Sequence, residues 1–168
     1  ARMTRILGNN EVKAIIAAIG AGIGPEFNLD DMRYHRVVIF VDADVDGGHI
    51  SSLLLTFFYR HMQPMVEAGR LYLARAPLYK LSKGSDVRYV LNDTERDAVL
   101  AEWGSSNGVR IGRFKGLGEM DAEEMAKTVL SPGIELDLDN EPHPSILNPY
   151  HVQVTVEDAH RASTLMSR

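Results

Sequence analysis

Apolar positions in the first half of the chain follow two different patterns. They recur at helical spacing over residues 12–19, and Asn9 or Asn10 can cap this helix. Residues 36–41 (RVVIFV) instead form a continuous, mostly β-branched run, which predicts a strand buried on both faces of a parallel sheet. From residue 49 to about 67 the chain is apolar nearly all round and predicts a long, buried helix. Strand, acidic loop and helix in this order indicate an α/β fold.

The second half of the chain contains shorter elements separated by Gly, Ser and Asn residues. A turn at residues 83–86 joins two short apolar runs, which predicts an antiparallel region. We therefore expect an α/β fold with a parallel sheet flanked by helices and an additional antiparallel strand region. The expected strands are 70–74, 78–81, 88–91, 109–114 and 151–156, and the expected helices are 93–103, 121–130 and one starting near 157.

Composition places the chain among ordinary globular domains. It has 168 residues, is 45% hydrophobic and contains no Cys, so disulfide scaffolds and cysteine-bound metals are excluded. We expect one domain over residues 1–168, with a core at about 5–130, an acidic, proline-rich insertion at about 131–149, and a closing strand and helix at about 150–168. The sequence has no apolar run long enough for a membrane span or signal peptide, so we expect a cytoplasmic protein without a membrane partner.

Charge is distributed unevenly along the chain. The net charge is −5, but residues 131–150 carry four acidic and no basic residues, which leaves −1 for the rest. Residues 70–88 contain five basic residues and a single acid, Asp86. Three more basic residues follow, Arg110, Arg113 and Lys115. These groups are compatible with a local anion-binding face, although such charge runs are more often ordinary solvated surface.

Three alternate aspartates follow the predicted strand directly. Residues two apart in an extended chain point to the same side, so Asp42, Asp44 and Asp46 are expected to converge at the carboxyl edge of the sheet. Their mutual repulsion is relieved by a hard divalent cation with oxygen ligands, and Mg²⁺ is the cation we expect. In the alternative interpretation these side chains only cap the following helix.

Two known protein families have motifs that share parts of this aspartate pattern. An EF-hand calcium loop requires a Glu at its twelfth position, where this chain has Leu53, so that interpretation fails. A phosphatase of the haloacid-dehalogenase type uses two aspartates two residues apart, and Asp42 fits as its nucleophile with Asp44 as its acid/base. The later acidic elements of that family are not evident here, but a Mg²⁺-dependent phosphatase remains the alternative function.

Five segments of the sequence occur in an order that is typical of one protein family. They are residues 33–36 (RYHR), 42–50 (DADVDGGHI), 53–60 (LLLTFFYR), 76–80 (APLYK) and 113–120 (RFKGLGEM). Together they resemble the TOPRIM region of bacterial DNA gyrase B subunits, over most of residues 5–130, and residues 154–159 resemble a segment near the end of that domain. Residues 18–24 (AIGAGIG) resemble gyrase more than the related topoisomerase IV, which remains an alternative.

The resemblance implies a type IIA DNA topoisomerase subunit that supports Mg²⁺-dependent cleavage and religation of both DNA strands during ATP-dependent supercoiling. Asp42 and Asp44 correspond to the principal metal ligands and Asp46 to a more loosely bound third acid, with Mn²⁺ or Ca²⁺ as substitutes in binding. The implied partners are double-stranded DNA and the gyrase A subunit, which supplies the attacking Tyr, in an A2B2 heterotetramer. ATP would bind only in an ATPase domain that this sequence does not include.

The same resemblance points to DNA-binding residues and to one missing ligand. The implied DNA-binding residues are Lys115, Arg113, Lys80 and His49, each of which is alternatively an ordinary surface or turn residue. The family's catalytic Glu lies on a strand upstream of the segment that corresponds to Ala1, so no complete catalytic set is present. We therefore expect a fragment truncated on its amino-terminal side and inactive alone. A third, noncatalytic alternative is a docking scaffold whose aspartates only cap a helix.

Overall fold

The computed structural model describes residues 8–42, 45–131 and 148–165. The chain divides into two compact units. The first is formed within residues 1–39, 49–73 and 153–168, and the second within residues 40–48 and 74–152.

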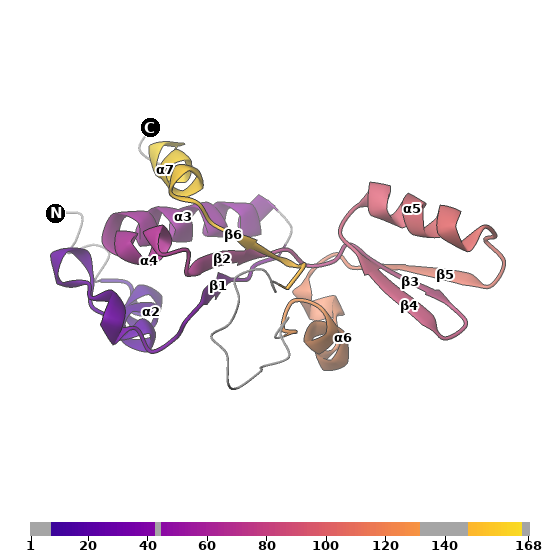
Figure 1. Cartoon of the computed structure of the whole chain (residues 1–168), viewed down its shortest axis with the longest axis horizontal. Helices are drawn as coiled ribbons and strands as arrows, with labels where there is room; N and C mark the ends of the chain where they lie inside the picture. Colours follow the sequence, from indigo (N-terminus) through magenta and orange to yellow (C-terminus); the bar gives the residue numbers. More distant parts are fainter. Residues whose placement is uncertain (1–7, 43–44, 132–147, 166–168) are drawn as a thin grey trace. The chain divides into compact units, whose positions relative to one another are not determined.

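The first unit is built on a small sheet with the strand order β1-β2-β6. Strands β1 (Val37–Ile39) and β2 (Leu71–Ala74) are parallel, with Val37 opposite Leu71, and β6 spans His151–Gln153. Helices are grouped around this sheet (Figure 1): α2 (Asn10–Ile19), α3 (Val45–His61), α4 (Gln63–Glu67) and α7 (Val156–Leu165). Two short 3-10 helices, Gly24–Glu26 and Leu29–Asp31, precede β1. The predicted parallel sheet flanked by helices is thus confirmed.

Helix ends in the first unit follow local sequence signals. Asn9 caps α2, because its side chain accepts a hydrogen bond from the backbone N–H of Val12, and Gly20 ends the helix with φ of 77°. The single helix expected over residues 49–67 is wrong in two respects. It starts earlier, at Val45, and it breaks at Met62, where a second helix begins with Pro64 in its first turn. Proline has no N–H to continue the preceding helix but fits the start of a new one.

The strand expected at residues 36–41 is shorter and less buried than predicted. Only Val37–Ile39 is strand, and Val38 is 37% exposed whereas Ile39 is 4% exposed. Val38 and Ile39 are consecutive strand residues and point to opposite faces of the sheet, so one face of β1 is covered and the other is partly open. The buried centre of this unit lies elsewhere, at Met62, Met65 and Leu71, which are fully buried.

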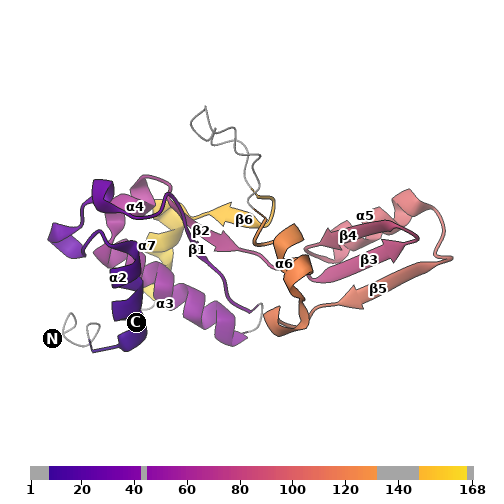
Figure 2. The same ribbon diagram turned by 90° about the horizontal axis from the view of Figure 1, so that it is seen from below.

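The second unit contains an antiparallel sheet with the strand order β4-β3-β5. Its strands are β3 (Tyr79–Lys83), β4 (Asp86–Val90) and β5 (Val109–Arg113), and α5 (Asp93–Trp103) covers one face of the sheet (Figures 1 and 2). Tyr79, Leu81 and Val90 form the core beneath the helix, with Trp103 packed against it. The predicted antiparallel region is confirmed, and the side chain of Asn92 caps α5.

The closing part of the second unit follows β5. A 3-10 turn, Leu117–Glu119, leads into α6 (Ala122–Lys127), which is capped by Asp121. Helix α6 ends three residues earlier than the expected Leu130. Buried Asn148 then donates hydrogen bonds to the carbonyls of Thr128 (2.7 Å) and Ser131 (2.8 Å). Most of the acidic insertion expected at 131–149 lies outside the described residues.

The closing strand and helix are both present with shifted bounds. Strand β6 ends at Gln153 instead of residue 156, and α7 already begins at Val156. Arg60 on α3 donates a hydrogen bond to the hydroxyl of Ser163 on α7 over 2.9 Å. Among the helices that the structure describes, none combines the length and apolarity needed to cross a membrane.

Candidate metal and DNA site

Asp42, the first of the three alternate aspartates, lies three residues after β1 and is exposed. Its Oδ1 accepts a hydrogen bond of 2.7 Å from the backbone N–H of Leu117, which is 75 residues away in the chain. Two of the five segments that carried the family resemblance, residues 42–50 and 113–120, therefore meet at this carboxylate. The sequence alone does not predict this contact.

Two glycines lie against Asp42 and explain why the segments contain glycine. A Cβ at Gly47 would come within 2.0 Å of the Asp42 carbonyl oxygen, a distance at which the backbone must shift. A Cβ at Gly116 would lie 3.3 Å from Oδ1 of Asp42, which is a tight contact. Gly48, in contrast, has no atom within 4 Å of the corresponding position. The close approach of the backbone to Asp42 thus requires Gly47 and favours Gly116.

A second carboxylate organises the loop itself. Glu119 accepts a hydrogen bond of 2.7 Å from the backbone N–H of Lys115 and donates its own N–H to the Gly116 carbonyl over 3.2 Å. The side chain of Lys115 is exposed. Sequence reasoning missed Glu119, and the available signal was an acidic residue four positions after a lysine within a glycine-rich turn.

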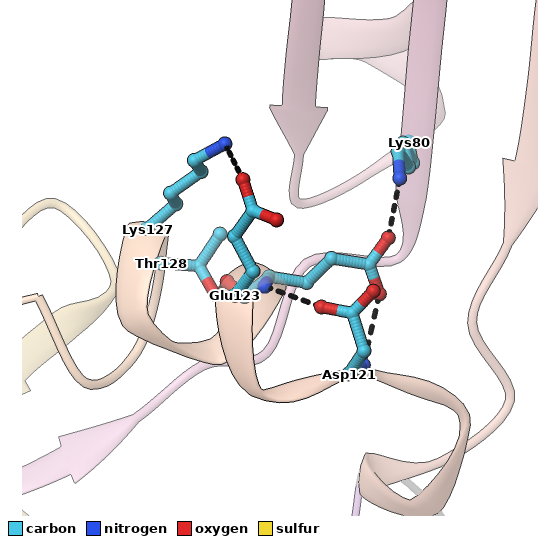
Figure 3. Close-up of polar contacts among 6 residues, drawn as sticks. Lys80, Asp121, Glu123, Lys127 and Thr128 are labelled. Atoms are coloured by element: carbon cyan, nitrogen blue, oxygen red, sulfur yellow. Dashed lines mark hydrogen bonds and ion pairs between the residues drawn. The ribbon is translucent and has the colours of Figure 1, made fainter.

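Lys80, one of the expected DNA-binding residues, is engaged inside the second unit (Figure 3). Its ammonium lies 2.5 Å from Oε1 of Glu124, whose side chain is only 10% exposed. Oε2 of Glu124 also accepts the backbone N–H of Asp121 at 3.0 Å. The hydrogen bond to Glu124 is the main reason why the pKa of Lys80 is raised above its ordinary value. This pair lines a cavity of about 600 Å³ together with Tyr89 and Lys127.

Other charges of the basic stretch 70–88 are paired as well. Arg88 binds Asp86 and Glu102, and the Arg88 contact is the first cause of the lowered pKa of the Asp86 carboxyl. Lys83 donates to the backbone carbonyls of Trp103 and Ser105. Much of the anion-binding potential that the sequence indicated in this stretch is therefore used within the fold.

The remaining predicted site residues are distributed as follows. Asp46 is exposed in the first turn of α3, and His49 is exposed further along the same helix. Arg113 is exposed at the end of β5, opposite Tyr79 in the register of the sheet. Asp44 lies outside the described residues.

The donors at Asp42 and Asp46 fit a hard divalent cation. Both carboxylates are exposed, and within the described residues no hydrogen bond occupies Oδ2 of Asp42. A group of three or more acidic, His or Cys side chains arranged to hold a metal is not found among the residues that the structure describes, a set that excludes Asp44. Among the described residues, Asp42 and Asp46 are the candidates from the aspartate motif for holding Mg²⁺.

Comparison with known proteins identifies the family of the chain. A model of the Toprim domain matches residues 1–76. The DNA gyrase B subunit of Staphylococcus epidermidis is 52% identical over 132 residues, which cover 79% of this chain and 20% of that protein. The gyrase B subunits of Halalkalibacterium halodurans and Archaeoglobus fulgidus are 42% and 46% identical and cover 98% and 99% of this chain.

The chain spans 24% of the length of the Halalkalibacterium halodurans and Archaeoglobus fulgidus proteins. The similarity extends well beyond the Toprim match and includes the loop at residues 115–119. The expected resemblance is thus confirmed, and the chain carries a Toprim domain and belongs to the family of DNA gyrase B subunits.

Proposed function

We propose that this chain supplies the metal-binding carboxylates for double-strand DNA cleavage and religation in a type IIA topoisomerase. The observation that supports this most directly is the contact between Asp42 and the Leu117 N–H. It brings the aspartate motif to the loop of Lys115, so a cation-binding acid and an exposed base lie in one region of the second unit. A bound metal and a nearby Lys can both stabilise the negative charge that develops when a phosphodiester is cleaved.

Each residue has a distinct task in this proposal. Asp42, Asp44 and Asp46 bind the cation, which when bound neutralises charge on the scissile phosphate and stabilises the leaving 3′ oxygen. Lys115 attracts the DNA backbone as a point charge, and the flanking Gly116 lets the chain approach it closely. Arg113 and His49, both exposed, are further candidates for phosphate contacts.

The remaining components of the reaction come from outside this chain. The proposed partner is the gyrase A subunit, which provides the attacking Tyr, and the proposed substrate is double-stranded DNA, in an A2B2 assembly in the cytoplasm. ATP would bind to a separate ATPase domain and drive supercoiling. The catalytic Glu that the family resemblance implies would complete the metal site.

The phosphatase alternative makes a different prediction about Asp42. As a nucleophile, Asp42 would be transiently phosphorylated and would bind beryllofluoride, which mimics phosphoaspartate. Membership in the gyrase B family favours the topoisomerase, in which Asp42 binds metal only. Saturable beryllofluoride binding that Asp42→Asn abolishes would reverse this preference.

The test combines the protein in its native full-length form with the gyrase A subunit, plasmid DNA and Mg²⁺. Double-strand breaks trapped by denaturant should need both proteins and should be lost in Asp42→Asn and Asp44→Asn. Glu123→Gln is the matched control, because Glu123 is an exposed acid that contacts Lys127 on the surface of α6. Unchanged cleavage by both aspartate variants would refute the proposal and favour the docking scaffold.

A further inference from the structure

From the geometry around Asp42 we infer that the turn at residues 115–119 positions this carboxylate for metal binding. The Leu117 N–H is the group that holds Asp42, and Glu119 is the residue that holds the turn in place. This inference rests on the proposed function, because it assigns to Asp42 the role of a metal ligand.

The two carboxylate oxygens of Asp42 differ in their contacts. Oδ1 is taken by the Leu117 N–H at 2.7 Å, and among the described residues no hydrogen bond occupies Oδ2. A carboxylate fixed through one oxygen keeps its plane and direction, so the other oxygen is preorganised for a cation. Groups that orient a metal ligand in this way typically change metal affinity by about 10- to 100-fold when they are removed.

The 3-10 turn at residues 117–119 presents the Leu117 N–H to Asp42. Leu117 begins the 3-10 turn, and its carbonyl accepts the Met120 N–H at 3.1 Å. The carboxylate of Glu119 accepts a hydrogen bond of 2.7 Å from the Lys115 N–H and thereby links the end of the turn to the residue before Gly116. Met120 is buried and anchors the end of the turn. Without the Glu119 carboxylate the Lys115 N–H loses its acceptor, and the turn loses one of its few fixed contacts.

Gly116, between Lys115 and Leu117, lies against the Asp42 carboxylate. Its backbone is fully extended, with φ of −166° and ψ of 173°, so conformation alone does not require glycine. The reason for glycine is contact, because a Cβ would lie 3.3 Å from Oδ1 of Asp42. The turn therefore lies against the carboxylate itself, as expected of a positioning element.

The backbone donor can be removed by substitution at Leu117. Proline has no N–H, and Leu117 is the first residue of the 3-10 turn, a position that proline tolerates. The extended conformation of Gly116 is also the one that a residue before proline adopts. Leu117→Pro thus deletes the hydrogen bond to Asp42, whereas Leu117→Ala keeps it and removes only the side chain.

The experiment measures Mn²⁺ binding to the full-length protein from the free-ion signal in electron paramagnetic resonance. It is accompanied by Mg²⁺ titrations of DNA cleavage in the presence of the gyrase A subunit. We expect Leu117→Pro and Glu119→Ala to weaken Mn²⁺ binding and to raise the Mg²⁺ midpoint by about 10-fold. Leu117→Ala and Glu119→Gln, which retain the donor and an acceptor, should stay close to the unsubstituted protein. Glu123→Ala controls for loss of an acid near the loop.

The outcomes separate this inference from the proposed function. If Asp42→Asn abolishes metal binding and cleavage but Leu117→Pro and Glu119→Ala keep the original midpoint, the inference is wrong and the function stands. If Asp42→Asn also leaves the midpoint unchanged, the proposed function itself fails. Thermal unfolding of each variant is recorded in parallel. If Leu117→Pro or Glu119→Ala unfolds, Glu119→Asp takes its place and is compared with Glu119→Gln, because we expect the shorter side chain of Asp to lose the contact with the Lys115 N–H.

Discussion

The ammonium of Lys80 on β3 and the carboxylate of Glu124 on α6 form an ion pair of 2.5 Å across 44 residues of sequence. Glu124 is also the partner of Asp121 in the capping box that begins α6. One carboxylate therefore ties the sheet of the second unit to the helix that follows the Lys115–Glu119 turn. A lysine that looks available for DNA in the sequence has a structural partner in the fold.

Removing this carboxylate should destabilise the second unit. Glu124→Ala leaves the Lys80 ammonium without its partner and the Asp121 N–H without its acceptor. We expect a loss of about 1–3 kcal/mol in the free energy of unfolding, since Glu124 is largely buried. Urea denaturation followed by circular dichroism measures this loss. Glu123→Ala, on the exposed side of the same helix, should change stability by less than about 0.5 kcal/mol, and an equal loss in both variants would contradict the prediction.

The same ion pair predicts a pH dependence at the alkaline end. The pKa of Lys80 is raised in the folded protein, mainly by the hydrogen bond to Glu124. Its contribution to stability is therefore complete below the unfolded-state pKa of about 10.4 and is lost as the pH rises through the higher folded-state value. The stability difference between the unsubstituted protein and Lys80→Met should stay constant from pH 7 to 9 and shrink above about pH 10. If the stability difference already changes between pH 6 and 8, the pH dependence comes from another titrating group and the prediction is wrong.

The extent to which the sequence predicts this fold depends on how local the signals are. Asn9, Gly20 and Asp121 end or begin helices through contacts within a few residues, and the expected helix boundaries there are correct. The strand at residues 36–41 is shorter and less buried than expected, because burial of Val38 depends on what packs on its face of the sheet and no local pattern encodes this.

In the candidate site too, local features can be predicted from the sequence and long-range contacts cannot. The alternate aspartates are recognisable from their spacing, whereas the contact from Leu117 to Asp42 joins segments 75 residues apart. Only the folded chain reveals it. Likewise, the positive charge of Lys80 is visible in the sequence, but its pairing with Glu124 depends on the packing of α6 against β3.

The two adjacent glycines of the aspartate segment should respond oppositely to the same substitution. Gly47→Ala would place a Cβ 2.0 Å from the Asp42 carbonyl oxygen and should cost more than about 4 kcal/mol or prevent folding. Gly48→Ala has open space at this position within α3, so it should be neutral or stabilise by up to about 1 kcal/mol. Thermal unfolding of both variants tests this. Similar effects at the two positions would show that the close approach of Gly47 to Asp42 does not occur.

The single Trp of the chain offers a local probe of the antiparallel region. Trp103 donates its indole N–H to Oδ2 of Asp86 at 3.1 Å. The pKa of Asp86 is lowered, first by Arg88, so the stabilising charge is present above the unfolded-state pKa of about 3.9 and is lost as the pH falls through the lower folded-state value. Trp fluorescence should therefore change below about pH 4, and Asp86→Asn should remove that transition. Asp97→Asn, which leaves Trp103 untouched, is the control and should retain it.

DNA binding should distinguish Lys115 from Lys80, although both belong to segments of the family resemblance. Lys115 is exposed and forms no ion pair with an acid among the described residues, whereas the charge of Lys80 is paired with Glu124. Each phosphate contact contributes about 0.9 to the slope of the logarithm of the binding constant against the logarithm of salt concentration. We expect Lys115→Ala, in the full-length protein together with the gyrase A subunit, to lower this slope by about that amount, and Lys127→Ala, the exposed control, to leave it unchanged. For Lys80→Ala we expect reduced stability with an unchanged slope. A loss of slope at Lys80 equal to that at Lys115 would mean that its ion pair opens on DNA binding and that both lysines contact phosphate.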